Sequence, residues 1–232
     1  MTPLAEILRP NNLDEYIGQE HLVGKGAILQ QSITSGSIPS MILWGPPGVG
    51  KTTLAHIISQ SLDKEFYTLS AVSSGVKDVR SVISQAAMFN GNAILFIDEI
   101  HRFSKSQQDS LLNAVEKGII TLIGATTENP SFEVISPLLS RCQVYILKSL
   151  DKENLLKLIH KGIEKLKEIH EIDIKLKESE ALIQISGGDA RKLHNALELF
   201  IYQKKVSSKK IVIDNKSVKE IIQENLAIYD KK

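Results

Sequence analysis

The segment 45–53 places the tightest constraint on what this chain can fold into. It reads Gly-Pro-Pro-Gly-Val-Gly-Lys-Thr-Thr, which matches the pattern G-x-x-x-x-G-K-[ST] of a phosphate-binding loop. An apolar run, 41–44, comes before it and a helical pattern, 54–58, comes after it. This order puts a nest of backbone N–H groups and the positive end of a helix at one point. The segment therefore predicts nucleotide binding and not a chance turn before a helix.

Each residue type in this loop has a chemical task. Gly45, Gly48 and Gly50 let the backbone approach phosphate oxygens without a Cβ in the way. Lys51 adds a mobile charge for the β- and γ-phosphates, and Thr52 offers a hydroxyl to Mg²⁺. The expected cofactors are therefore ATP and Mg²⁺. The loop residues expected to bind them are Gly45, Pro46, Pro47, Gly48, Val49, Gly50, Lys51, Thr52 and Thr53.

Composition narrows the class of protein. The chain has 232 residues, of which 42% are hydrophobic and 24% charged, as in soluble globular proteins. Its apolar runs are only as long as strands, so no membrane partner is expected. The net charge of +1 means that any DNA-binding surface has to be local. One cysteine, Cys142, excludes an internal disulfide and fits a reducing compartment, so a cytoplasmic location is expected.

Short apolar strands alternate with helical patterns in the first two thirds of the chain. This alternation predicts an α/β fold with a parallel, doubly wound sheet and helices on both faces. From Asp151 the chain becomes helical and strongly charged, which predicts a nucleotide-binding core at 1–148 and a small helical domain at 149–232. The expected strands are 41–44, 66–69, 93–99, 119–125 and 144–147; the expected helices are 4–8, 26–35, 51–62, 76–89, 104–117, 151–169, 179–185, 189–203 and 217–225, with a short extended piece at 211–213.

Two carboxylates, Asp98 and Glu99, end an apolar strand. Propensity does not place Asp-Glu at the end of a buried strand. ATP hydrolysis needs a bound metal ion and a base that orients water. Asp98 is expected to hold Mg²⁺, directly or through water, and Glu99 to polarise the attacking water.

A threonine and two arginines are further candidates. Thr127 follows a later strand, where parallel sheets place ligands, and it is expected to position the water or the γ-phosphate. Thr126 is a rival for this role, and a turn threonine is the plain alternative. Arg141 precedes the last strand, and Arg191 lies in the first turn of a helix for which Asp189 is the expected N-cap. Taken singly, each arginine is more often a solvated surface charge.

The order of these motifs resembles the AAA+ ATPases of the clamp-loader clade. In that resemblance 45–53 is the Walker A motif, 94–99 is Walker B and Thr127 is the first sensor. Arg141, within Ser-Arg-Cys, matches the arginine that reaches into the neighbouring subunit's site. Arg191, within Gly-Asp-Ala-Arg, matches the second sensor. The resemblance implies an AAA+ P-loop NTPase with a five-stranded parallel sheet flanked by helices, followed by a helical lid.

Longer strings give a finer resemblance. Residues 98–103 (DEIHRF) and 124–133 (GATTENPSFE), with 9–10, 13–19, 73–77 and 105–109, are similar to the family of replication-associated recombination protein A, which includes the Werner-helicase-interacting ATPases. The resemblance covers essentially the whole chain. It implies a DNA-acting ATPase of replication-fork maintenance, recombination and repair, associated with the nucleoid. It also implies homotetramers and contacts to single-strand-binding protein.

The family resemblance also assigns contacts. Tyr16 and Ile17 are expected to line an adenine pocket. The candidates for DNA backbone contacts, with an ordinary polar rim as the alternative, are Lys77, Arg102, Ser104, Lys105 and Gln107. The histidines are expected to be packing or surface residues. Family members continue past residue 232 into a domain that assembles the tetramer, so this chain is expected to be mostly monomeric.

Three alternative functions remain open. A clamp-loader ATPase subunit would share every catalytic motif, but the strings at 101–103 and 124–133 favour a member of the replication-associated recombination protein A family. An ATP-gated DNA-binding scaffold with little turnover is a second alternative, against which the intact Glu99 and both arginines argue. A protein-unfolding motor would show an aromatic-hydrophobic pore loop where 71–77 is small and polar.

Overall fold

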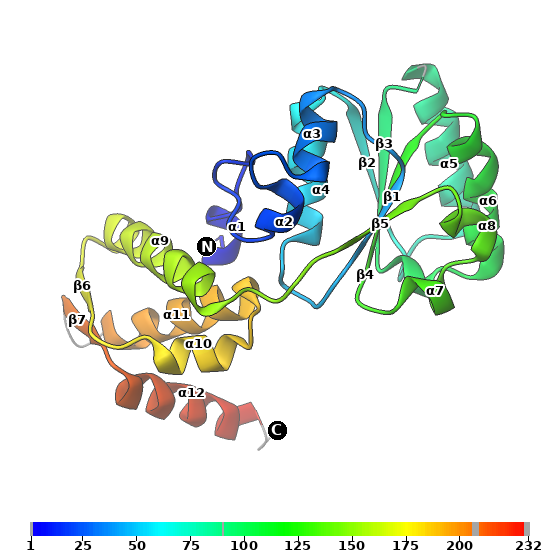
Figure 1. Cartoon of the computed structure of the whole chain (residues 1–232). Helices are drawn as coiled ribbons and strands as arrows, with labels where there is room; N and C mark the ends of the chain where they lie inside the picture. Colours follow the sequence, from blue (N-terminus) through cyan, green and yellow to red (C-terminus); the bar gives the residue numbers. More distant parts are fainter. Residues whose placement is uncertain (1, 90, 206–208, 230–232) are drawn as a thin grey trace. The chain divides into compact units, whose positions relative to one another are not determined.

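A computed structural model describes residues 2–89, 91–205 and 209–229 (Figure 1). The chain divides into two compact units, Pro10–Lys148 and Ser149–Lys232 with Met1–Arg9. We call them the core unit and the lid unit. The sequence places residues 1–9 in the core, but in the structure residues 2–9 belong to the lid unit. Leu4 is the reason, because its side chain is fully buried in the lid's apolar cluster and its N–H donates to Glu198.

The core unit is built on a five-stranded sheet in the order β2-β3-β4-β1-β5, and every pairing is parallel. Its strands are β1 (Met41–Trp44), β2 (Glu65–Ser70), β3 (Ala93–Asp98), β4 (Thr121–Thr126) and β5 (Gln143–Ile146). The central strands β1, β3 and β4 are buried almost throughout, which requires cover on both faces. The predicted α/β fold with five parallel strands is confirmed.

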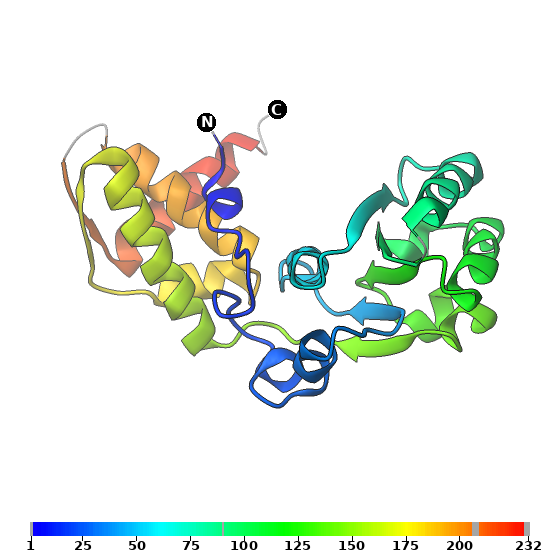
Figure 2. The same cartoon turned by 90° about the horizontal axis from the view of Figure 1, so that it is seen from above.

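Helices cover the two faces of this sheet, as Figures 1 and 2 show. Consecutive residues of β1 point to opposite faces: Met41 and Leu43 pack with α3 and α4, and Ile42 packs with α5, α6 and α8. The helices of the core unit are α2 (Glu20–Val23), α3 (Ile28–Thr34), α4 (Lys51–Ser61), α5 (Val76–Ala86), α6 (Lys105–Glu116), α7 (Pro130–Glu133) and α8 (Ser136–Leu139), with 3₁₀ turns η1 (Ala87–Phe89) and η2 (Ile100–Arg102). The short helices α2, α7 and α8 are absent from the sequence prediction, which expects only a short turn near residues 137–141.

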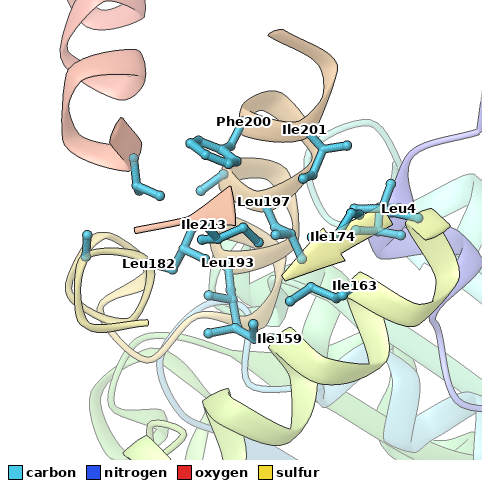
Figure 3. Packing of buried hydrophobic residues seen from close by; sticks show 14 of the residues in the cluster. Leu4, Ile159, Ile163, Ile174, Leu182, Leu193, Leu197, Phe200, Ile201 and Ile213 are labelled. Carbon is cyan, nitrogen blue, oxygen red and sulfur yellow. The ribbon is translucent and has the colours of Figure 1, made fainter. Parts of the chain in front are cut away.

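The lid unit is mainly helical but also contains a small sheet. Its helices are α1 (Leu4–Ile7), α9 (Lys152–His170), α10 (Glu180–Ser186), α11 (Ala190–Lys205) and α12 (Asn215–Tyr229). β6 (Asp173–Leu176) and β7 (Lys210–Ile213) pair in parallel. The sequence predicts an extended piece at 211–213, which corresponds to β7, but it does not predict the partner strand β6. In Figure 3, side chains of α9, α11 and β6 meet Leu4 in one cluster.

Within the described part of the chain, no helix is long and apolar enough to cross a membrane.

His194 is a titratable group inside the lid's apolar core. It is 5% exposed, and its Nε2 has no hydrogen-bond partner among the described residues. Burial lowers the pKa of His194 to about 4, and a hydrogen bond with the backbone of Leu158 opposes this with a smaller effect. The folded state therefore favours the neutral ring. Its contribution to stability is complete above the unfolded pKa and is lost as the pH falls towards the folded pKa.

We predict that lowering the pH from 7 to 5 removes about 2 kcal/mol of unfolding free energy through His194 alone. His194→Leu, which cannot titrate, should lose that part of the pH dependence. Urea unfolding at the two pH values measures it, and His160→Leu, at an exposed position of α9, is the control. Equal pH dependence in His194→Leu and the parent would contradict the assignment.

Candidate functional site

The carboxyl ends of β1, β4 and β3 lie side by side at one edge of the core sheet. Trp44 pairs with Thr126, and Ile97 pairs with Gly124. The N–H of Gly45 donates to the carbonyl of Thr126 at 3.1 Å, which ties the start of the loop to the end of β4. The parallel sheet thus brings together the loop, the two carboxylates and Thr127, as the fold class predicts.

The glycines of the loop are required by its geometry. Gly48 and Gly50 have φ of 69° and 99°, a region that favours glycine. A Cβ on Gly45 would collide with the carbonyl oxygen of Leu147, and a Cβ on Gly50 would lie 2.5 Å from the hydroxyl of Tyr16. The loop backbone can therefore follow this path only with glycine at these positions.

Lys51 begins helix α4 and is held within the loop. Its side chain is largely buried, and Nζ donates to the carbonyls of Gly45 at 2.7 Å and Pro46 at 2.8 Å. The first N–H groups of α4 have no partner within the helix and favour an anion. A glycine backbone, a helix start and an ammonium group at one place fit a nucleotide phosphate. Thr52 is half-buried in the first turn of α4, and its role as a ligand of Mg²⁺ together with Asp98 stays a prediction.

Tyr16 supports this loop from the apolar side. It packs in one cluster with Val49, and its hydroxyl lies 3.3 Å from the carbonyls of Val49 and Gly50. Burial raises the pKa of Tyr16, so the hydroxyl stays protonated and donates. Ile17 is half-buried beside it. The adenine pocket at Tyr16 and Ile17 stays a prediction, since the observed contacts of Tyr16 are with the loop.

The two carboxylates follow β3 and have different surroundings. Asp98 is half-buried, and its Oδ1 accepts from the N–H of Glu99 at 3.1 Å. Glu99 has a left-handed backbone, with φ 55° and ψ 44°. Its Oε2 lies 3.2 Å from Nε2 of His101 and 3.8 Å from Nε of Arg102. The histidines are expected from the sequence to be packing or surface residues, so the contact of His101 with Glu99 is not predicted.

The adjacent threonines differ in what surrounds them. Thr126 is fully buried, and its Oγ1 contacts Nδ1 of His101 at 2.9 Å and the backbone of Glu128. Thr127 is half-buried at the edge of the sheet. The hydroxyl of Thr126 is thus engaged within the protein, which leaves Thr127 as the better candidate for a γ-phosphate contact.

The arginines lie in different units. Arg141 is exposed after α8, where it binds the carbonyl of Pro137 at 2.7 Å and the carboxylate of Glu116 at 3.4 Å. Among the contacts of the described residues, Arg141 forms no ion pair with the loop or with Asp98 and Glu99. Arg191 is exposed on the first turn of α11 in the lid unit, where Asp189 caps the helix through the N–H of Lys192 at 3.0 Å.

The candidates for DNA contacts gather at the starts of α5 and α6. Gln107 completes the predicted capping box by accepting from the N–H of Ser104 at 2.8 Å, and it also donates to the carbonyl of Ser74 at 2.7 Å. This amide joins the start of α6 to the loop before α5. Lys77 and Lys105 are exposed in the first turns of these helices. The side-chain oxygen and nitrogen of Gln107 both form hydrogen bonds within the protein, so this residue stabilises the surface formed by the two helix starts.

This fold and loop define a nucleotide-binding domain of the P-loop class. Residues 8–136 match the family described as the Holliday junction DNA helicase RuvB P-loop domain, and residues 168–232 match an AAA C-terminal domain. The chain belongs to this RuvB-type family of AAA+ proteins.

Individual relatives agree with the family match. Replication-associated recombination protein A of Escherichia coli K12 is 46% identical over 99% of this chain and 53% of its own length. ATPase WRNIP1 of Dictyostelium discoideum is 43% identical over 99% of this chain and 28% of its own length. These relatives confirm the finer resemblance. The chain spans about half the length of the relatives named replication-associated recombination protein A.

A solved structure supports the fold independently. The Holliday junction branch migration motor RuvB of Thermotoga maritima superposes with a TM-score of 0.78 at 30% identity, over 93% of this chain and 72% of that chain.

We predict that Gly50→Ala weakens nucleotide binding at least about tenfold, because the added Cβ adds backbone strain and meets the Tyr16 hydroxyl. Gly36→Ala is the matched control: Gly36 has φ 77°, but a Cβ there meets nothing within 4 Å. The control should cost about 1–2 kcal/mol of stability without changing affinity. Titration with a fluorescent nucleotide and urea unfolding measure both effects. Equal affinity in Gly50→Ala and Gly36→Ala would count against the loop geometry.

Proposed function

We propose that this chain hydrolyses ATP and couples hydrolysis to DNA in replication-associated recombination and repair. The supporting observation is the sheet edge at which the phosphate loop, Asp98, Glu99 and Thr127 come together. The relatives named replication-associated recombination protein A and WRNIP1 support this role. The alternative of a clamp-loader subunit receives no comparable support.

In the proposed reaction each residue of the site has one task. The loop and the start of α4 bind the phosphates, and Lys51 exchanges its loop carbonyls for phosphate oxygens. Thr52 and Asp98 hold Mg²⁺, which when bound neutralises charge on the transferred phosphoryl group. Glu99 accepts a hydrogen bond from the attacking water and polarises it. Thr127 orients that water or the γ-phosphate.

Arg141 and Arg191 are the remaining candidates for roles in the proposed reaction. We propose that Arg191 of the lid unit acts on the nucleotide of its own chain, and that Arg141 acts on the nucleotide of a neighbouring copy. Arg141 contacts a carbonyl and an exposed carboxylate, and these contacts are weak enough to be replaced by contacts with a nucleotide. A homo-oligomer, the tetramer implied by the family resemblance, and contact with single-strand-binding protein belong to the same proposal.

DNA would lie against the joined starts of α5 and α6. The helix starts and the side chains of Lys77, Lys105 and Arg102 offer positive charge on an otherwise nearly neutral chain, and Ser104 adds a hydroxyl group. Backbone phosphates are suited to such a surface, because helix starts and lysines hold them without reading sequence.

Glu99→Gln is expected to leave ATP affinity unchanged and to lower turnover about 100-fold or more, because the amide keeps the shape but cannot polarise water. Nucleotide binding and steady-state hydrolysis are measured on the same preparations. Glu128→Gln, at an exposed position nearby, is the matched control. Turnover of Glu99→Gln within twofold of the parent would exclude Glu99 as the base.

Replacing Lys77 and Lys105 together by alanine should weaken binding of single-stranded DNA and make it less sensitive to salt. Each lost phosphate contact reduces the slope of log K against log salt by about 0.7, so the pair should reduce it by about 1.4. The control pair is Lys25→Ala with Lys117→Ala, also exposed, with Lys117 at the opposite end of α6. Equal slopes in the two variants would place the DNA elsewhere.

A further inference from the structure

His101 connects the polar ends of two neighbouring strands in the core unit. Its Nε2 lies 3.2 Å from Oε2 of Glu99, just after β3, and its Nδ1 lies 2.9 Å from Oγ1 of Thr126, the last residue of β4. The side chain of His101 is only 12% exposed. None of the functions proposed above uses this histidine.

The hydrogen-bond partners determine where the ring protons lie. An ionised Glu99 can only accept, so Nε2 of His101 must carry a hydrogen. Oγ1 of Thr126 accepts from the N–H of Glu128 at 3.0 Å, and its one hydrogen can go to Nδ1 or to the carbonyl of Glu128 at 3.2 Å. A neutral ring accepts from Thr126, and a protonated ring donates to it while the hydroxyl turns to the carbonyl. The contacts that run from Glu99 through His101 to Thr126, which we call the bridge, can therefore form whether the ring is neutral or protonated.

The bridge contacts the side chain of Glu99, a residue with an unusual backbone conformation. Glu99 is in the left-handed region without being glycine, which costs about 1–2 kcal/mol and has to be offset locally. The contacts of His101 and Arg102 both fall on Oε2 of Glu99. They restrict the rotamer of this carboxylate and leave Oε1 to accept from water.

The other end of the bridge is anchored in the sheet. Thr126 is fully buried, and its carbonyl accepts from the N–H of Gly45, where the phosphate loop begins. The position of the Glu99 carboxylate is therefore linked, through one imidazole, to the strand that carries Thr127 and supports the loop.

We propose that His101 is a positioning residue for hydrolysis: Nε2 fixes the carboxylate of Glu99, and Thr126 fixes the ring through Nδ1. This rests on the proposed function, in which Glu99 polarises the attacking water. A purely structural histidine at this position would affect stability and nucleotide affinity, but it would not act on the rate of the chemical step alone.

Steady-state hydrolysis of ATP·Mg²⁺ by the full chain separates these roles. His101→Ala should lower kcat about tenfold or more with KM and ATP affinity within about twofold, and His101→Gln, which keeps a donor at similar reach, should recover most of the loss. Thr126→Val removes the partner of Nδ1 at equal volume and should also lower kcat. Thr126→Ser, which keeps the hydroxyl, is its control. His160→Ala, at an exposed position of α9, is the general control.

The effects of His101→Ala and Thr126→Val on kcat should not be independent if both substitutions act through the same bridge. His101→Ala combined with Thr126→Val should be no slower than His101→Ala alone. An unchanged kcat in His101→Ala, no recovery by His101→Gln, or reductions that multiply in the double variant would each overturn the proposal.

Nitrogen NMR of the histidine rings tests the bridge without any turnover. The ring of His101 should carry its hydrogen on Nε2 in the neutral form. Glu99→Gln should shift the Nε2 resonance and Thr126→Val the Nδ1 resonance, with the ring of His160 unaffected. A ring that responds to neither change overturns this inference. A parent chain that hydrolyses no ATP even at concentrations at which its copies associate, with both ring responses present, would instead overturn the proposed function.

Discussion

The parallel pairing of β4 with both β1 and β3 is the constraint on which the candidate site depends. It fixes the register Trp44 to Thr126 and Ile97 to Gly124, so the residues that follow each strand emerge at one edge. A slip of one residue would turn every buried side chain of a strand to the opposite face. Because Ile42 packs with other helices than Met41 and Leu43, such a slip would exchange side chains between the two apolar clusters and disrupt the packing of both. Packing of the core therefore also determines the geometry of the site.

The sequence predicts this part of the molecule well because its signals are local. The pattern of 45–53, the apolar strands and the carboxylates after β3 each lie within a few consecutive residues. The Ser104 and Gln107 capping box is readable for the same reason, and the structure contains both of its bonds. Local patterns of this kind were sufficient to predict the fold and the loop.

Features that depend on distant residues could not be predicted in this way. The contact of His101 with Thr126 joins residues 25 apart, and a single histidine after Asp-Glu carries no periodicity. Leu4 lies in the cluster formed by α9 and α11, so residues 2–9 join a unit that is otherwise formed by residues much later in the chain. β6 has only the four residues Asp-Ile-Lys-Leu, too few for alternation to distinguish a strand from a loop. In each case, the feature can be recognised only when the contacts between residues distant in the sequence are known.

The two carbonyls that hold Lys51 have a consequence for selectivity. Its ammonium group is already solvated by the protein at Gly45 and Pro46, so a ligand gains only the difference between those bonds and its own. A nucleoside without phosphates offers nothing better than a carbonyl and leaves the lysine where it is. A triphosphate offers full negative charges and charge-assisted hydrogen bonds, which are about twice as strong. In the proposed function, the loop is therefore expected to favour ligands that carry phosphate charges.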